Sequence, residues 1–221
     1  MPNIKKLPRA DRARHTDSLP SKPRGVVKLP AAPGAVRIIA GKYRRTPLKV
    51  APVRGLRPTP DRVRETVFNW IAHLCGPLEG KSALDMFAGT GALGFEAASR
   101  GARRAVLCEM SPLACGALGA AKEKLKDAAS EILPGDVFKT LLRLKADRDL
   151  FDLVFIDPPY ETRLQGKALE SLAGLLSPGA LIYLEAPKGE PLPFLEASGF
   201  RVEREGFAAG VSFYLLRKDG L

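Results

Sequence analysis

The stretch SALDMFAGTGALGFEAASR, residues 82–100, decides the fold of this chain. Its first part, SALDMF, is a short apolar run that predicts a buried strand, and ALGFEAASR predicts the helix that follows. Between them, Gly89, Gly91 and Gly94 match the pattern G-x-G-x-x-G, which lets a chain turn tightly from a strand into a helix. The stretch therefore predicts a βα unit with a ligand-binding loop at the carboxyl end of its strand.

The sequence after this unit repeats the same alternation of strand and helix. Further strand candidates are RAVLCE, EILPGD, FDLVFI and ALIYLE, and the helical stretches between them are SPLACGALGAAKEKLKDAA, VFKTLLRLKA and RLQGKALESLAGLL. Repeated βα units form a parallel sheet with helices on both faces. The last stretch, FRVEREGFAAGVSFYLLRK, predicts two antiparallel strands joined by a short glycine-containing connection. The predicted fold class is α/β.

Basic residues are concentrated at the N-terminal end of the 221 residues, whose formal net charge is +11. Residues 1–64 contain seventeen Lys and Arg against three acidic residues, and residues 65–221 contain eighteen against twenty-one. A basic segment beside a nearly neutral body favours a polyanionic partner, most simply nucleic acid. A solvated, solubilising tail is the alternative.

Three segments follow from composition and pattern. Residues 1–34 are basic and rich in proline, so we expect a mobile tail. Residues 35–80 contain VRIIAGKYRRTPLKV, which predicts a short strand pair, and TPDRVRETVFNWIAHL, which predicts a helix capped by Thr59 with Pro60 in its first turn. Residues 81–221 form the main domain.

The cysteines and the apolar runs exclude several classes of protein. Cys75, Cys108 and Cys115 have no C-x-x-C spacing, and only His15 and His73 could join them as ligands, so we expect neither disulfides nor a metal site. No apolar run approaches the ~20 residues of a membrane helix, and the N-terminus lacks a signal peptide, which favours the cytoplasm. An Arg-rich organelle transit peptide is the alternative.

The glycine loop alone does not identify its ligand. Glu109 ends the next strand about 20 residues later, where an acid accepts from ribose hydroxyls, and this arrangement suits a nicotinamide cofactor equally well. A glycine turn with no ligand is a third interpretation. However, Asp85 at the strand end would oppose a pyrophosphate and suit a cation such as S-adenosylmethionine. Glu96, early in the helix, also disfavours an anion unless it points to solvent.

A second motif, FIDPPY at residues 155–160, ends the FDLVFI strand at the same edge of the sheet as the glycine loop, so we expect the Gly89 and Asp157 corners to open into one crevice. The Asp157 carboxylate and the Pro158 carbonyl offer two acceptors at a fixed separation, because proline restricts the backbone. Two such acceptors hold both hydrogens of an exocyclic NH₂ group and direct its lone pair at a methyl donor. Tyr160, which follows Pro159, provides a ring on which a base can stack. Alternatively, the prolines only end a strand and Tyr160 lies in the core.

Together these motifs carry a family resemblance. VRIIAGKYRRTPLKV, GLRPTPDRVRETVFNWI, LDMFAGTGALGFEAASRGA and FIDPPY resemble bacterial small-subunit (16S) ribosomal RNA guanine-N2 methyltransferases, which are class I S-adenosylmethionine-dependent enzymes with a D-P-P-Y motif. The block R-P-T-x-D-R-V-R-E-T is the most family-specific part, and residues 1–35 look like an extension. The resemblance implies a Rossmann-like, seven-stranded, mainly parallel sheet with a reversed final hairpin. It also implies a cytoplasmic enzyme that methylates one guanine in a 30S assembly intermediate, and we expect a monomer.

The resemblance also implies a role for each matching position. Cofactor contacts are implied for Asp85, Phe87, Ala88, Gly89, Thr90, Gly91, Glu109, Met110, Asp136, Val137 and Phe138. The target pocket is implied to consist of Asp157, Pro158, Pro159 and Tyr160. RNA-binding positions are implied at the entrance of this pocket for Arg57, Thr59, Arg62 and Arg64, and contacts with RNA phosphates are implied for Lys42, Arg44 and Arg45. An exposed structural face is the alternative for these basic residues, and a local ion pair with Glu65 is the alternative for Arg64.

Two other functions remain open at this point. Adenine also presents an exocyclic amine to a D-P-P-Y pocket, so DNA adenine-N6 methylation is an alternative, although no segment is large enough for a separate target-recognition domain. A non-catalytic RNA-binding assembly factor is the other alternative. A nicotinamide oxidoreductase fits poorly, because nothing near D-P-P-Y accepts a hydride.

Overall fold

The computed structural model describes residues 35–53, 56, 58–190, 192–208 and 210–218. These residues belong to one compact unit that runs from Ala32 to Leu221. The predicted basic tail, residues 1–34, and Arg57 lie outside the described residues, and the side chain of Tyr160 is not described either.

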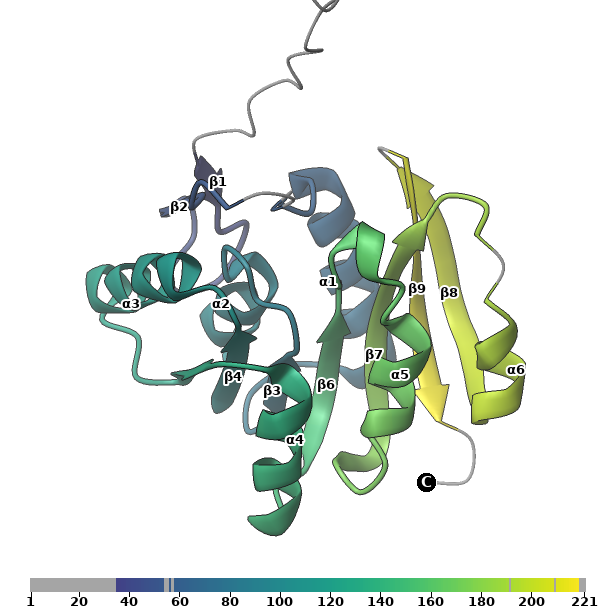
Figure 1. Cartoon of the computed structure of the whole chain (residues 1–221). Helices are drawn as coiled ribbons and strands as arrows, with labels where there is room; N and C mark the ends of the chain where they lie inside the picture. The colour runs from purple at the N-terminus through teal and green to yellow at the C-terminus, as the bar shows by residue number, and fades with distance from the viewer. Residues whose placement is uncertain (1–34, 54–55, 57, 191, 209, 219–221) are drawn as a thin grey trace, which may run out of the picture. The chain divides into compact units, whose positions relative to one another are not determined.

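A seven-stranded sheet forms the centre of this unit (Figure 1). Its strands, in chain order, are β3 (Ser82–Asp85), β4 (Arg104–Glu109), β5 (Ser130–Pro134), β6 (Phe151–Ile156), β7 (Leu176–Pro187), β8 (Phe200–Ala208) and β9 (Val211–Lys218). The spatial order is β5-β4-β3-β6-β7-β9-β8. The neighbouring strands β5, β4, β3, β6 and β7 are parallel, and β9 pairs antiparallel with β7 and β8. The predicted parallel sheet with a terminal antiparallel hairpin is therefore confirmed.

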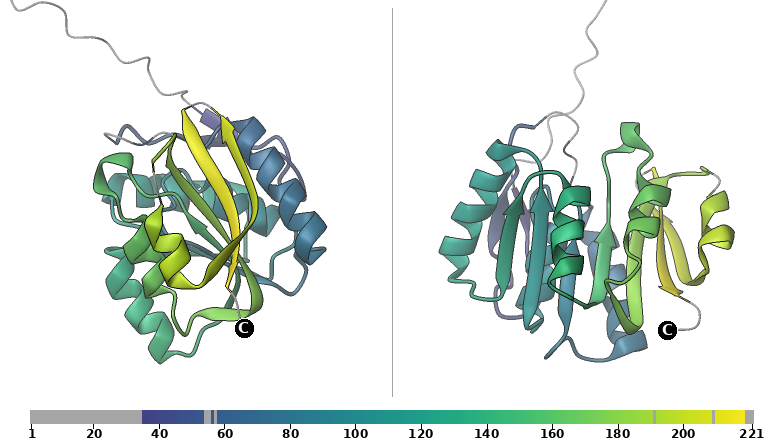
Figure 2. Two further views of the ribbon diagram at one scale, coloured as in Figure 1. Left: turned by 90° about the vertical axis from the view of Figure 1, so that its right-hand side faces the viewer. Right: turned by 60° about the horizontal axis from the view of Figure 1, so that its bottom comes forward.

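Helices cover both faces of the sheet (Figures 1 and 2). One face is covered by α1 (Asp61–Cys75), α2 (Ala92–Ser99) and α3 (Pro112–Leu125), and the other by α4 (Val137–Ala146), α5 (Gln165–Ser171) and α6 (Pro193–Ser198). Side chains of each strand alternate between the two cores: in β4, Ala105 and Leu107 pack into the first core, and Val106 and Cys108 into the second. The fold is a Rossmann-like α/β sandwich.

The N-terminal segment packs into the same core as the sheet. Strands β1 (Ala35–Arg37) and β2 (Pro47–Lys49) form the predicted antiparallel pair, and α1 is the predicted helix. Val36, Leu48 and Phe68 belong to the core cluster that also contains sheet residues such as Phe155. Side chains on both sides of the predicted boundary at residues 80 and 81 thus share one hydrophobic core.

Local details depart from the sequence-based predictions in three places. The N-cap of α1 is Pro60 without a side-chain cap, so the predicted capping role of Thr59 is wrong. Helix α6 and a short 3-10 helix, η1 (Tyr160–Thr162), were not predicted. The predicted helix RLQGKALESLAGLL is shorter, since α5 runs only from Gln165 to Ser171 and Leu176 already belongs to β7.

Neither membrane spans nor metal clusters are found in the described part of the chain. Every described helix is too short or too polar to cross a membrane. Among the same residues, no three His, Cys, Asp or Glu side chains come together as a candidate metal site. Cys75, Cys108 and Cys115 are free thiols.

Candidate active site

A cavity of about 590 Å³ opens at the carboxyl edge of the sheet. It lies where the strand order reverses between β3 and β6, which is the usual ligand position in open α/β sheets. The ends of β3, β4, β5 and β6 contribute its floor and walls, and residues of the segment before α1 line it as well. Its lining includes Val53, Leu56, Pro58, Thr59, Asp85, Phe87, Ala88, Gly89, Thr90, Glu109, Met110, Asp136, Val137, Phe138, Asp157, Pro158 and Pro159.

The glycine loop turns at two left-handed positions. Gly89 and Gly91 have φ angles of 52° and 75°, which L side chains rarely adopt. A Cβ atom on Gly89 would also lie 2.6 Å from Cδ1 of Leu56, so the segment before α1 lies directly over the loop. The N–H of Gly89 donates to Glu109 Oε2 at 2.8 Å, which joins the loop to the end of β4. These contacts explain why the loop needs glycine before any ligand is considered.

Asp85 is a fully buried carboxyl at the end of β3. Its Oδ2 accepts from the N–H of Gly94 at 3.0 Å. Burial raises the pKa of Asp85 to about 7, because the Gly94 hydrogen bond only partly offsets the desolvation and Glu109 adds a repulsive charge. A cationic ligand group beside this carboxyl would stabilise its ionised form.

The end of the cavity formed by β4, β5 and α4 is lined by polar and apolar groups. Glu109 Oε1 accepts from the N–H of Ser111 at 2.7 Å, and Met110 is 72% exposed at the cavity rim. Asp136 caps α4 by accepting from the N–H of Lys139 at 3.1 Å, next to the buried Val137. This end therefore combines a carboxylate with an apolar surface.

The Asp157 corner faces the same cavity. Asp157 follows β6, and its Oδ2 accepts a hydrogen bond from the Thr59 hydroxyl at 3.0 Å. Burial and the neighbouring Glu185 carboxylate raise the pKa of Asp157 well above its usual range, and Asp85 adds to this, whereas the Thr59 hydrogen bond lowers it. Pro158 is buried and Pro159 is exposed. The sequence-based expectation that the Gly89 and Asp157 corners open into one crevice thus agrees with the geometry.

The structure brings nearly all predicted cofactor and target residues together. Of the eleven predicted cofactor residues, ten line the cavity, and Gly91 is instead the N-cap of α2. The stacking role of Tyr160 stays a prediction, because its side chain lies outside the described part. Among the predicted RNA contacts, Lys42, Arg44, Arg45 and Arg62 are exposed, and Arg57 lies outside the described residues.

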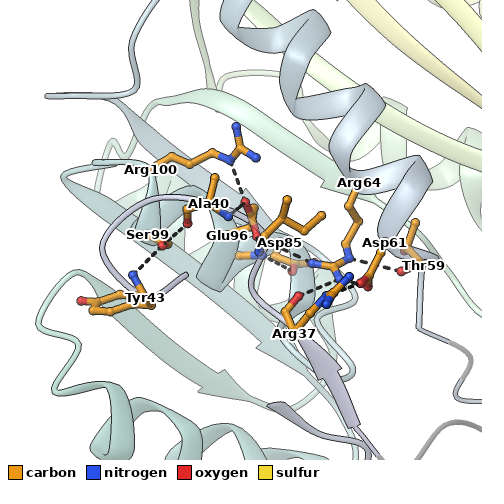
Figure 3. Close-up of polar contacts among 12 residues, drawn as sticks. Arg37, Ala40, Tyr43, Thr59, Asp61, Arg64, Asp85, Glu96, Ser99 and Arg100 are labelled. Carbon is orange, nitrogen blue, oxygen red and sulfur yellow. Dashed lines mark hydrogen bonds and ion pairs between the residues drawn. The ribbon is translucent and has the colours of Figure 1, made fainter. Parts of the chain in front are cut away.

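Arg64 does not lie at the entrance of the pocket, and this prediction is corrected. Its side chain is fully buried, so it cannot meet an RNA phosphate. It pairs with Asp61 at 2.7 Å and with Glu96 at 3.7 Å, not with the exposed Glu65 that sequence reasoning offered as its partner (Figure 3). The helix spacing explains the error, because Arg62 and Arg64 lie about 200° apart around α1.

Glu96 also departs from expectation, because it does not point to solvent. Its carboxylate is fully buried and accepts from the N–H groups of Ile39 and Ala40 at 2.7 and 3.0 Å. Arg100 Nε donates to the same carboxylate at 2.7 Å (Figure 3). Every residue of α2 is buried. An acid in so apolar a helix was the sequence signal that it must be paired inside the protein.

Two further groups at the site were missed by sequence reasoning. Glu185 lies buried in β7, where Tyr183 donates to its Oε2 at 2.7 Å, and its charge acts on Asp157. Val53, Leu56 and Pro58 line the cavity from the N-terminal segment. Leu56 and Pro58 lie in the family-like stretch GLRPTPDRVRETVFNWI, but that pattern does not say that they line the cavity, and Glu185 and Val53 belong to no motif, so only tertiary placement identifies these residues at the site.

Comparison with known proteins identifies the family. The family model described as "Conserved hypothetical protein 95" matches residues 36–214. The chain belongs to this family. It is 38% identical over 169 residues to "Ribosomal RNA small subunit methyltransferase D" of Haemophilus influenzae, across 75% of this chain and 86% of that one. The Escherichia coli protein of the same name is 36% identical over 188 residues, across 84% and 91% of the two chains.

A solved structure agrees with the family assignment. The yhhF protein from Escherichia coli is 35% identical, has a TM-score of 0.70, and is matched over 85% of this chain and 100% of that chain. The two proteins thus share the Rossmann-like fold of methyltransferases.

Proposed function

We propose that this chain transfers a methyl group from S-adenosylmethionine to the exocyclic N2 amine of a guanine in small-subunit ribosomal RNA. The observation that carries the proposal is that the glycine loop and Asp157 line one cavity. A methyl donor and an amine acceptor bound there would lie within reach of each other. The named relatives, which are ribosomal RNA small subunit methyltransferases, support the same substrate class.

The residues around the glycine loop fit the methyl donor. S-adenosylmethionine supplies an electrophilic methyl group on a sulfonium, together with an ammonium group, a ribose and an adenine. The buried Asp85 carboxyl suits a cationic group, and Glu109 at the end of β4 suits ribose hydroxyls. Val137 and Phe138 supply the apolar surface that an adenine ring needs. The cavity volume of about 590 Å³ is within the usual range of small-molecule sites.

The residues after β6 fit the target amine. Thr59 donates to Oδ2 of Asp157, which leaves Oδ1 to accept from one hydrogen of an exocyclic amine, and the Pro158 carbonyl would accept from the other. Held in this way, the nitrogen lone pair faces the methyl donor, and such orientation can lower a barrier by about 7 to 11 kcal/mol. The raised pKa of Asp157 makes its carboxylate a better acceptor for the proton that the amine loses.

The exposed basic residues suit an RNA partner. Lys42, Arg44 and Arg45 lie in the turn between β1 and β2, and Arg62 lies on the outer side of α1. Phosphate contacts of this kind position RNA without reading its sequence.

We further propose that the enzyme acts as a monomer in the cytoplasm on an assembly intermediate of the 30S subunit. We also propose that the chain divides into a basic tail of residues 1–34 and the segments 35–80 and 81–221.

Nucleoside mapping tests the proposal. The full chain is incubated with S-adenosylmethionine carrying a labelled methyl group and with small ribosomal subunits from cells that lack this enzyme. The expected product is N2-methylguanosine at one position of the small-subunit RNA. Label in N6-methyladenosine of added DNA would favour the DNA enzyme instead, and binding of RNA without transfer of label would favour an assembly factor.

A further inference from the structure

Thr59 links the N-terminal segment to the proposed catalytic carboxylate. It is 4% exposed and lies before α1 in a stretch that is neither helix nor strand. Its hydroxyl donates to Asp157 Oδ2, 98 residues later in the chain. Because Thr59 has no helical or sheet partner to fix its backbone, its position must be fixed by other contacts.

Those contacts come from Arg64. Its Nε donates to the Thr59 carbonyl at 3.2 Å, and its Nη2 donates to the Arg37 carbonyl at 2.8 Å and to Asp61 Oδ1 at 2.7 Å. A planar guanidinium can serve these three acceptors at once, whereas a lysine ammonium cannot match the same geometry. Arg64 thus ties Thr59 to both β1 and the first turn of α1 (Figure 3).

Glu96 holds Arg64 from the other side. The carboxylate lies 3.7 Å from Arg64 Nη1, and neither side chain is exposed. Burial of a lone arginine would be prohibitively costly, so this pair explains how the guanidinium stays inside the protein. Because Glu96 lies in α2, the helix that begins at the glycine loop, the contacts run from that helix through Arg64 and Thr59 to Asp157.

We propose that Arg64 is a positioning residue for methyl transfer, which acts by fixing Thr59 so that the Thr59 hydroxyl orients the Asp157 carboxylate. This inference rests on the proposed function. It gives the family block R-P-T-x-D-R-V-R-E-T a role within the site, in place of the RNA contacts expected for Arg64 and Thr59 and the helix cap also expected for Thr59. Arg64 itself touches neither of the reacting groups.

The proposal predicts a change in how the rate of methyl transfer depends on pH. Three charged or polar groups act on Asp157: Glu185 of β7 and Asp85 of β3 raise its pKa together with burial, and Thr59 lowers it. Asp157 must be ionised to accept from the amine, so the rate falls as the pH falls through this pKa. Loss of the Thr59 hydrogen bond raises the pKa further and moves the acid limb of the profile to higher pH. A purely structural role would not move it.

The experiment compares Thr59→Val, Thr59→Ser, Arg64→Lys and the double variant Thr59→Val/Arg64→Lys in the full chain. Arg148→Lys, at an exposed turn before β6, is the matched control for the arginine change. Turnover and its pH profile are measured with S-adenosylmethionine and unmodified small subunits, and cofactor affinity is measured by calorimetry. Arg64→Lys keeps the positive charge beside Glu96, so we expect it to fold, and the Thr59 variants test the same link without altering the buried ion pair.

We expect Thr59→Val and Arg64→Lys each to lower kcat by about 100-fold, as a small displacement of a reacting group does, with cofactor affinity unchanged. Both should move the acid limb of the pH profile to higher pH, and Thr59→Ser should have the kcat and pH profile of the wild-type enzyme. The double variant should lose no more than either single variant. The proposal would be overturned if the loss of kcat in the double variant equalled the product of the two single losses. It would also be overturned if Arg64→Lys lowered the melting temperature but left the pH profile and kcat unchanged. Failure of the wild-type enzyme to methylate the subunits would instead overturn the proposed function.

Discussion

The inner and outer sides of helix α1 use the same residue type for opposite purposes. Arg62 is exposed on the outer side, while Arg64, two residues later, is fully buried on the inner side. The inner arginine contacts Asp61, Glu96 and two backbone carbonyls, so its guanidinium serves as a buried hydrogen-bond donor that holds these segments together. The outer arginine adds to an exposed basic surface.

The comparison shows that net charge in the N-terminal segment overstates its RNA-facing surface. Part of the positive charge of residues 35–64 is already paired within the protein, because Glu96 and Asp61 pair with the buried Arg64 and Asp61 also pairs with Arg37 at the surface. The exposed remainder, which includes Lys42, Arg44, Arg45 and Arg62, is what an RNA phosphate would meet. We therefore propose that the inner side supports the site and that the outer side contributes to RNA binding.

The largest expected effect on the inner side is on stability. Glu96→Gln removes the fully buried countercharge of Arg64 and leaves only the part-exposed Asp61 as its carboxylate partner, so we expect the free energy of unfolding to fall by about 3 to 5 kcal/mol. Glu65→Gln, at an exposed position of α1, is the matched change on the outer side and should shift it by less than about 0.5 kcal/mol. Urea denaturation followed by circular dichroism measures both. Equal effects of the two changes would remove the distinction between the sides.

The outer surface should instead govern RNA affinity. Arg44→Ala and Arg45→Ala should each weaken RNA binding and reduce the slope of log affinity against log salt by about one, with kcat at saturating RNA unchanged. Filter binding over a range of salt concentrations measures the slope. Arg148→Ala, in the exposed turn between α4 and β6, is the control. An unaltered slope in both Arg44→Ala and Arg45→Ala would show that the turn between β1 and β2 does not contact phosphate.

A smaller expected effect is the pH dependence of S-adenosylmethionine binding at the glycine-loop side of the cavity. The pKa of Asp85 is raised to about 7, so this carboxyl is partly protonated at neutral pH in the free protein. A cation bound beside it favours the ionised form, and below pH 7 binding must therefore release a proton. We expect the affinity for S-adenosylmethionine to fall by up to about tenfold per pH unit below 7 and to level off above pH 8.

Calorimetry between pH 5.5 and about 8.5 measures this dependence. Asp85→Asn should bind more weakly at pH 8 and should lose the pH dependence assigned to this carboxyl. An affinity in the wild-type protein that does not change with pH would show that Asp85 does not meet a cationic group.

Motifs at the ends of strands were predictable from the sequence. The strand at residues 82–85, the loop with Gly89 and the D-P-P-Y segment depend on local patterns, and the topology of parallel βα units places their ends at one edge. The reversed hairpin was predictable for the same reason, because two strand patterns are separated by a short turn. Local rules therefore sufficed to predict the shared crevice.

The roles of Thr59, Arg64 and Glu185 could not be predicted. Thr59 followed by Pro60 fits a helix N-terminus, but tertiary contact directs its hydroxyl to Asp157 instead. Arginine on an amphipathic helix has no local signal that distinguishes a buried fork from a phosphate contact. The effect of Glu185 on Asp157 depends on the pairing of β6 with β7, which joins residues about 30 apart in the chain.

The measurement that tests the central claim most directly separates methyl transfer from cofactor binding in Asp157→Ala. If the Asp157 corner serves the amine and the glycine corner serves the methyl donor, single-turnover methylation of unmodified small subunits should fall by at least about 100-fold. The dissociation constant for S-adenosylmethionine, measured on the same preparation, should stay within about threefold of wild type, since Asp85 and Glu109 are intact. Turnover close to wild type, or a loss of cofactor binding as large as the loss of transfer, would contradict this division of the cavity.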